Sequence, residues 1–367
     1  MNRLIIIGNG FDLAHNLPTS YKDFFEWYWC DWREKLYNSN KKKEIDNLCE
    51  FQLQENSLLE GLWTLRNIYP QYFEKNAPVK DFFNAINTGK MQCVFNIQSV
   101  LLRAICQSYE TSRWVDIEKI FYHLLCNKTN PVVSPQKLND DMDFLRVKLS
   151  EYLGIIQKNI SPNINKTDIC QKLFDSIKKQ DIAIGSMAFW NNTRDEYCYP
   201  KRTMILSFNY TSIADIYFNS CDYNRYVVNH IHGKLEDPQN MIFGYGDEMD
   251  SLFQTIVNKN ENNYLNNIKS IKYLESANYR QLLSFLDSDA FQIYIMGHSC
   301  GNSDRTLLNT LFEHENCVSI KPYYHKRKDG TDNYTDLVQN IYRNFTNMQL
   351  MRDRVVNKTF CEPLSEK

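Results

Sequence analysis

Short apolar runs that end in glycine are the feature that most constrains the fold of this chain. Only 12 glycines occur in 367 residues, yet seven of them fall in four clusters beside β-like runs: Gly8 with Gly10, Gly233, Gly244 with Gly246, and Gly297 with Gly301. Glycine at a strand end permits a sharp turn and the close approach of a ligand. Any one cluster fits an ordinary turn equally well, but together the clusters predict a ligand crevice at the carboxyl ends of strands.

The order of the apolar runs predicts an α/β fold. We expect strands at Arg3 to Ile7, Thr203 to Phe208, Tyr226 to Ile231, Met241 to Phe243, Phe291 to Met296 and Cys317 to Ile320. Helical patterns separate most of them, as at Ser212 to Phe218 and Arg305 to Phe312. Strands that alternate with helices indicate a mostly parallel sheet with helices on both faces.

A long stretch separates the first strand from the others. Its apolar residues mostly follow helical spacing, as at Phe82 to Tyr109 and Met142 to Ile156, and loops with a short helix are expected at Ser161 to Pro200. We therefore expect a core formed by residues 1–19 and 201–350, a mainly helical insertion at 20–200 and a C-terminal tail at 351–367.

Composition excludes several classes of protein. Lys and Arg number 42 against 44 Asp and Glu, so bulk charge does not favour nucleic acid. No apolar run approaches the roughly 18 residues that a membrane span needs. Eleven cysteines occur without a Cys-x-x-Cys pair, which is typical of reduced thiols and predicts no structural zinc. We expect a cytoplasmic protein that neither enters a membrane nor holds a metal.

The first polar cluster is Gly8-Asn9-Gly10-Phe11-Asp12, and Thr19 and Ser20 follow shortly before the next helix. A strand, a glycine turn and a helix N-terminus together present backbone N–H groups to an anion, which suits the phosphates of a nucleotide. The third glycine of the full dinucleotide-binding motif is missing.

Two further clusters offer polar side chains at strand ends. Asn209 can hold a hydroxyl or a water, or it can simply cap the next helix. His230 and His232 are predicted to share one face of a strand that Gly233 ends. His232 can act as a general base near neutral pH, while a metal pair and two hydrogen-bonded structural histidines remain alternatives.

The last cluster, Gly297-His298-Ser299-Cys300-Gly301, precedes Asp304 and a helix. Gly-x-Ser-x-Gly between a strand and a helix also matches the nucleophile elbow of serine hydrolases. That alternative needs His325 together with Glu313 or Asp329, and it assigns no function to the loop from Gly8 to Asp12.

In this order, the segments Asn2 to His15, Leu17 to Tyr21, Ser207 to Thr211 and His230 to Lys234 resemble the AbiH family of bacterial abortive-infection proteins. That family in turn resembles sirtuins. The resemblance implies a Rossmann-like, mostly parallel sheet of the sirtuin/DHS type with a large helical insertion, and NAD as ligand or substrate.

The resemblance to sirtuins also implies roles for single residues. Gly8, Gly10 and the segment Leu17 to Ser20 would close over NAD, and Asp12 would bind a ribose hydroxyl. Asn209 would orient ribose and water, and His232 would be the catalytic histidine. The adenosine half would lie near Gly297, Ser299 and Asp304. The zinc ribbon of sirtuin deacetylases is absent and Phe208 replaces a Gln, so protein deacetylation is not expected.

The resemblance therefore implies an antiphage effector that hydrolyses the nicotinamide–ribose bond of NAD. A phage-derived trigger and a homo-oligomer are the partners that it suggests. The alternative is a non-catalytic protein that senses a nucleotide, and a serine hydrolase that uses Ser299 is the third hypothesis.

Overall fold

The computed structural model describes residues 1–74, 77–111, 116–126, 134–161, 167–187, 198–219 and 221–365. The chain divides into two compact units: residues 1–19 with 153–367, and residues 20–152. The expected insertion extended to residue 200, but the segment from residue 153 belongs to the first unit. Part of the loop region expected at 161–200 lies outside the described residues.

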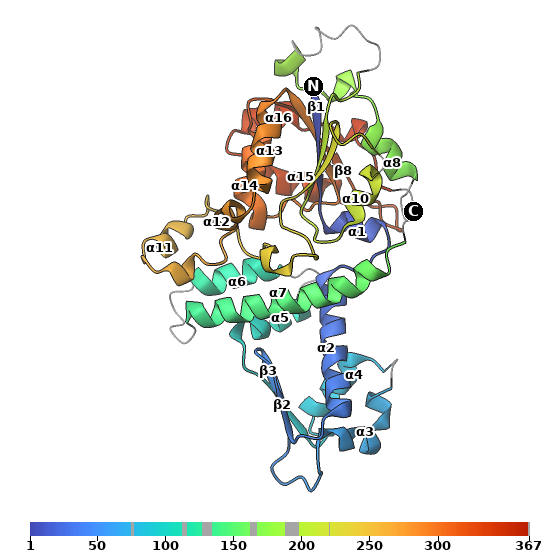
Figure 1. Cartoon of the computed structure of the whole chain (residues 1–367), viewed down its shortest axis with the longest axis vertical. Coiled ribbons are helices and arrows are strands. Elements are labelled where there is room, and N and C mark those ends of the chain that lie inside the picture. Colours follow the sequence, from blue (N-terminus) through green and yellow to red (C-terminus); the bar gives the residue numbers. More distant parts are fainter. Residues whose placement is uncertain are drawn as a thin grey trace. The chain divides into compact units, whose positions relative to one another are not determined.

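The first unit is built on a five-stranded parallel sheet (Figure 1). Its strands are β1 (Asn2–Ile7), β5 (Thr203–Ser207), β6 (Tyr226–His230), β7 (Phe291–Met296) and β8 (Cys317–Tyr323), in the spatial order β6-β5-β1-β7-β8. The central strand pairs Ile5 with Ile205 on one side and with Tyr294 on the other. A mixed α/β fold with a mostly parallel sheet, as expected from the sequence, is confirmed.

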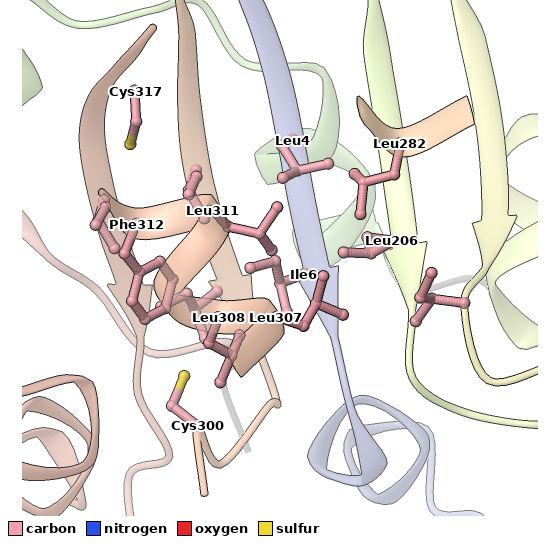
Figure 2. Packing of buried hydrophobic residues seen from close by; sticks show 14 of the residues in the cluster. Leu4, Ile6, Leu206, Leu282, Cys300, Leu307, Leu308, Leu311, Phe312 and Cys317 are labelled. Atoms are coloured by element: carbon pink, nitrogen blue, oxygen red, sulfur yellow. The ribbon is translucent and has the colours of Figure 1, made fainter. Parts of the chain in front are cut away.

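Both faces of the sheet are covered. Successive side chains of a strand point to opposite faces, and Leu4 and Ile6 pack into one apolar cluster while Ile5 and Ile7 pack into another. Figure 2 shows Leu4 and Ile6 with residues of the helices that cover the first face. Burial on both faces explains why β1 is apolar at successive positions instead of alternating.

The helices of this unit surround the sheet. Those whose residues join the cluster of Leu4 are α13 (Asn278–Asp287), α14 (Arg305–Phe312), α15 (Tyr334–Arg343) and α16 (Met348–Arg354). Those that contribute to the cluster of Ile5 are α1 (Asn9–Ala14), α8 (Thr167–Phe174) and α10 (Ile213–Phe218). Two short helices, α11 (Phe253–Val257) and α12 (Lys269–Lys272), follow β6.

The second unit contains both helices and strands. Its helices are α2 (Tyr21–Asn38), α3 (Leu65–Ile68), α4 (Val79–Asn87), α5 (Val100–Thr111), α6 (Ile117–Cys126) and most of α7 (Pro135–Lys158). An antiparallel sheet joins β2 (Lys43–Ile45), β3 (Cys49–Leu53) and β4 (Cys93–Ile97).

The strands of the second unit correct the helical expectation for Phe82 to Tyr109, because β4 interrupts that stretch. In β3, Cys49, Phe51 and Leu53 are buried while Glu50 and Gln52 are partly exposed, which is the period of two of a strand. Strands of three to five residues are too short to stand out in a largely helical segment. Pairing with neighbouring strands stabilises them.

Two other local expectations differ from the structure. Met241 to Phe243 is buried but forms no strand, and Ile242 N donates to His232 O at 2.8 Å. The end of the chain, expected as a tail, begins within α16, and it then pairs Val355 with Ile320 of β8 and Pro363 with Tyr324, directly after β8.

Candidate functional site

The carboxyl ends of the parallel strands bring the predicted clusters to one edge of the sheet. β1 ends before Gly8, β5 before Phe208, β6 before Ile231 and β7 before Gly297. The chain builds β5 and β6 on one side of β1 and then β7 and β8 on the other, so the order changes direction between β1 and β7. Ligands of open α/β sheets bind at such a position.

The glycines at this edge pack against one another. Gly10 N donates to Gly297 O at 2.8 Å, and a Cβ on Gly10 would lie 2.9 Å from Gly297 Cα. Gly297 has a φ of +78°, and a Cβ there would lie 2.1 Å from Phe11 N. These glycines are therefore needed for the contact between the β1 and β7 loops, and the Gly10 N–H is already bonded.

Asp12 and Asn209 form a buried polar pair. The Asn209 side-chain amide donates to Asp12 Oδ1 at 2.7 Å and to Gly8 O at 2.9 Å, and Thr211 Oγ1 donates to Asp12 Oδ2 at 2.8 Å. Burial raises the pKa of Asp12 to about 7, although both hydrogen-bond donors oppose the shift. The Asn209 amide thus joins two segments that are 197 residues apart.

His232 belongs to a second buried cluster, which centres on Asp304. His232 Nε2 lies 3.2 Å from Asp304 Oδ1 and 3.2 Å from the Tyr273 hydroxyl. Lys269 Nζ lies 2.7 Å from the same carboxylate oxygen, and His298 Nε2 lies 3.8 Å from Asp304 Oδ2. All five side chains are buried. The contacts of His232 and His298 with Asp304 therefore join two of the clusters predicted from the sequence, the one that contains His232 and the one that runs from Gly297 to Asp304.

Burial and charge set the protonation of this second cluster. Burial alone would raise the pKa of Asp304, but Lys269 and the two histidines bring it well below its usual range. Burial lowers the pKa of His232, and the charge of Lys269 adds to that effect. Burial likewise lowers the pKa of His298 to about 4. At neutral pH the cluster therefore contains an Asp304 carboxylate paired with Lys269 and two neutral histidines.

The two clusters meet at Phe208. Its ring lies between the two histidines, with centroid distances of 4.9 Å to His232 and 4.3 Å to His298. Asn209 follows Phe208 directly in the chain. The predicted residues Asn209, His232 and Asp304 are therefore held at one edge of the sheet.

His230 does not share a face with His232, which corrects the expectation. β6 ends at His230, and a turn closed by Gly233 N bonded to His230 O follows. His230 Nε2 instead lies 3.0 Å from Asp215 of α10, on the opposite side of the sheet from Tyr273. Gly233 has a φ of +84°, and the backbone of Asn240 leaves no room for a Cβ there.

The other predicted residues near β1 have local contacts. Phe11 is fully buried and packs against His15 and Tyr217. Thr19 Oγ1 donates to Asn9 Oδ1 at 2.5 Å, which ties the end of the loop to its beginning. Ser20 caps α2 through a reciprocal pair of hydrogen bonds with Asp23.

Ser299 is exposed, and its carbonyl accepts a hydrogen bond from Asn340 at 2.8 Å. The residues proposed to assist it are engaged elsewhere. Glu313 accepts from the backbone of Thr346 and Asn347, and Asp329 accepts from Thr331. No hydrogen bond joins Ser299 Oγ to a histidine in the described part of the chain.

A small pocket borders the second cluster. It has a volume of about 140 Å³, and its lining includes Glu248, Ser270, Tyr273, Tyr279, Asp304 and Leu307. Lys269 and Tyr273 could not be identified from the sequence, because neither lies beside a glycine cluster or a strand end. A lysine in an otherwise ordinary short helix carries no signal of its burial.

The described residues contain no group of three or more His, Cys, Asp or Glu side chains that could hold a metal ion. No helix in the described ranges is long and apolar enough to cross a membrane.

Comparison with known proteins identifies a family. A family model described as bacteriophage abortive infection AbiH matches residues 4–325. No curated protein matches the chain. Since the matched region covers most of the chain, including most of β1 and the other four strands of the parallel sheet, the protein belongs to the AbiH family of bacteriophage abortive-infection proteins.

Proposed function

We propose that this protein acts in abortive infection by binding NAD or a related nucleotide at the carboxyl edge of its parallel sheet and hydrolysing the nicotinamide–ribose bond. The antiphage role follows from the AbiH family. The observation that supports the chemistry is that Asn209, His232 and Asp304 are all buried at that edge, Asn209 in contact with Asp12 and His232 in contact with Asp304.

The topology supports a nucleotide as the ligand. Numbered along the chain, the strands of the sheet have the order 3-2-1-4-5, which matches the first five strands of the 3-2-1-4-5-6 order of Rossmann-type dinucleotide-binding folds. In such folds the nucleotide lies where the strand order changes direction. Here that position is the contact between the β1 and β7 loops.

The proposed hydrolysis is a simple substitution at the ribose carbon. The bond from this carbon to the ring nitrogen breaks, and its electron pair leaves with nicotinamide, which departs neutral because the bound ring was cationic. The oxygen of water bonds to the carbon, and one proton passes to a base. His232, kept neutral by burial and by Lys269, is our candidate for that base.

Binding of a dinucleotide requires a change in the loops described above. The Gly10 N–H is bonded to Gly297 O, and the Asn209 amide is bonded to Gly8 O and Asp12. A phosphate at Gly10 or a ribose at Asn209 must replace these bonds. We infer that the described conformation is a resting one and that a phage-derived trigger favours an open one.

The experiment measures NAD and nicotinamide by mass spectrometry in cells that express the protein during phage challenge. We expect the wild type to lose NAD and His232→Ala to lose it roughly 10² to 10⁴ times more slowly, as for removal of a general base. The control is His314→Ala, which removes a histidine that contacts Asp287 away from the edge.

Equal NAD pools in wild type and His232→Ala contradict the hydrolysis. If NAD nevertheless raises the melting temperature of the purified protein, the alternative of a nucleotide-sensing protein without catalysis is supported instead. The third hypothesis predicts that a fluorophosphonate labels Ser299.

A further inference from the structure

The pocket beside Asp304 has the size of one ring. Its volume is about 140 Å³. A cavity of roughly 150 Å³ holds one benzene molecule, whereas pockets for larger ligands measure about 300 to 1,000 Å³. The pocket therefore accommodates a single six-membered ring and excludes a whole dinucleotide.

The charges around the pocket sum to one negative charge. Glu248 and Asp304 contribute two carboxylates, and Lys269 behind Asp304 contributes one ammonium. The neighbouring Asp247 is paired with Arg305 at 3.4 Å and adds no net charge. A cation in the pocket would gain Coulomb energy, and an anion would lose it.

The carboxylates are held in place and retain acceptor capacity. Glu248 accepts a hydrogen bond from the Ser270 hydroxyl through one oxygen. On Asp304, Oδ1 receives the close contacts from Lys269 and His232. Among the described residues, Oδ2 has a 3.4 Å contact from Ser303 Oγ and a 3.8 Å contact from His298. Each carboxylate has two oxygens with several acceptor positions, so an N–H donor can still be bound.

The remaining walls suit a flat, apolar body. The rings of Tyr273 and Tyr279 are stacked, with centroids 5.7 Å apart and planes at 9°. Leu307 of α14 adds an aliphatic surface. Tyr273 also stacks on His232, with centroids 6.1 Å apart and planes at 16°, so its two faces are covered. We therefore assign the attraction between a cation and an aromatic face, which strengthens away from water, to Tyr279.

From the volume, the net charge and the aromatic wall, we infer that this pocket binds a planar cationic ring, of which the pyridinium ring of oxidised nicotinamide is the example that deepens the proposed function. The inference depends on the proposed function for one point only, namely that the ring is part of bound NAD. Asp304 lines the pocket and His232 Nε2 lies 3.2 Å from its Oδ1, so one carboxylate separates the pocket from the candidate base. This inference places the nicotinamide ring where the resemblance to sirtuins implied the adenosine half.

The test compares three rings of nearly equal shape and different charge with the purified full-length protein. Their binding is measured by calorimetry or ligand-observed NMR. We expect 1-methylnicotinamide, a cation, to bind more tightly than neutral nicotinamide, and nicotinate, an anion, to bind least.

Two variants locate the site. Glu248→Gln is expected to weaken binding of the cation by roughly five-fold while nicotinate binding stays equal or improves, because a half-buried carboxylate is removed. Tyr279→Leu removes one aromatic face and is expected to weaken the binding of all three rings. The matched control Glu275→Gln changes an exposed glutamate that pairs with Lys272, and it should leave every affinity unchanged.

Absence of binding by all three rings, equal affinity for 1-methylnicotinamide and nicotinate, or an unchanged preference in Glu248→Gln would overturn the inference. NAD consumption is measured separately. Ring binding without NAD loss contradicts only the proposed hydrolysis, whereas NAD loss without charge preference contradicts only the assignment of this pocket.

Discussion

At the scale of single residues, the glycines at the strand ends serve packing in the described conformation. The contact between Gly10 and Gly297 joins the β1 loop to the β7 loop, although 287 residues separate them in sequence. Gly8 belongs to the same contact, since a Cβ there would lie 2.8 Å from His298 Cα. The glycine pattern is typical of ligand binding, but these glycines are also required because no side chain fits at their positions in this conformation.

We expect Gly297→Ala to destabilise the protein by about 3 kcal/mol or more, because a φ of +78° and a backbone atom 2.1 Å away both oppose a side chain. The free energy of unfolding in urea measures this. In the control, Gly154→Ala within α7, a Cβ meets nothing within 4 Å, and we expect stabilisation by about 0.5 to 1 kcal/mol. Equal effects of both changes would contradict the steric argument.

At the scale of elements, the short helix α12 supplies the positive charge that the Asp304 cluster requires. Lys269 is 1% exposed and contacts Asp304, whereas Lys272 at the other end of the same helix pairs with exposed Glu275. A buried charge is tolerated when it is paired and becomes costly when its partner is removed.

Lys269→Met is therefore expected to cost about 3 to 5 kcal/mol of stability, while Lys272→Met changes it by less than about 0.5 kcal/mol. Adding Asp304→Asn to Lys269→Met should recover part of the loss, because the unpaired carboxylate is removed. Thermal and urea unfolding of the wild type, Lys269→Met, Asp304→Asn and the double variant measure the coupling between the two side chains. A double variant less stable than Lys269→Met alone would argue against the buried pair.

At the scale of the molecule, the end of the chain protects an edge of the parallel sheet. β8 is an edge strand, and Val356 N donates to Ile320 O at 2.9 Å while Leu364 N donates to Tyr324 O at 2.8 Å. Leu364 is also buried in the cluster of Ile5. Exposed strand edges favour association between molecules, so covering the edge of β8 counters it.

A chain that ends at Arg354 is expected to lose about 3 kcal/mol, from the exposure of Val356 and Leu364, and to associate through β8. Differential scanning calorimetry and light scattering measure these effects. Lys358→Ala, in the same segment, removes an ion pair with Asp332 and contacts with the rings of Tyr324 and Tyr334 at an exposed side chain, and we expect it to stay close to the wild type. A truncated protein that stays monomeric and equally stable would show that the segment is dispensable.

The sequence by itself determined the parallel α/β class, because a buried central strand such as Leu4 to Ile7 needs apolar side chains on both faces. It also indicated which segments end at the site, since Asn209, His232 and Asp304 follow recognisable strands. Only the tertiary structure decided that β2, β3 and β4 form a second sheet, that His230 and His232 face opposite ways, and that Lys269 is buried against Asp304. The physical reason is that strand periodicity is local, whereas short-strand pairing, turn direction and the burial of a charge depend on residues distant in sequence.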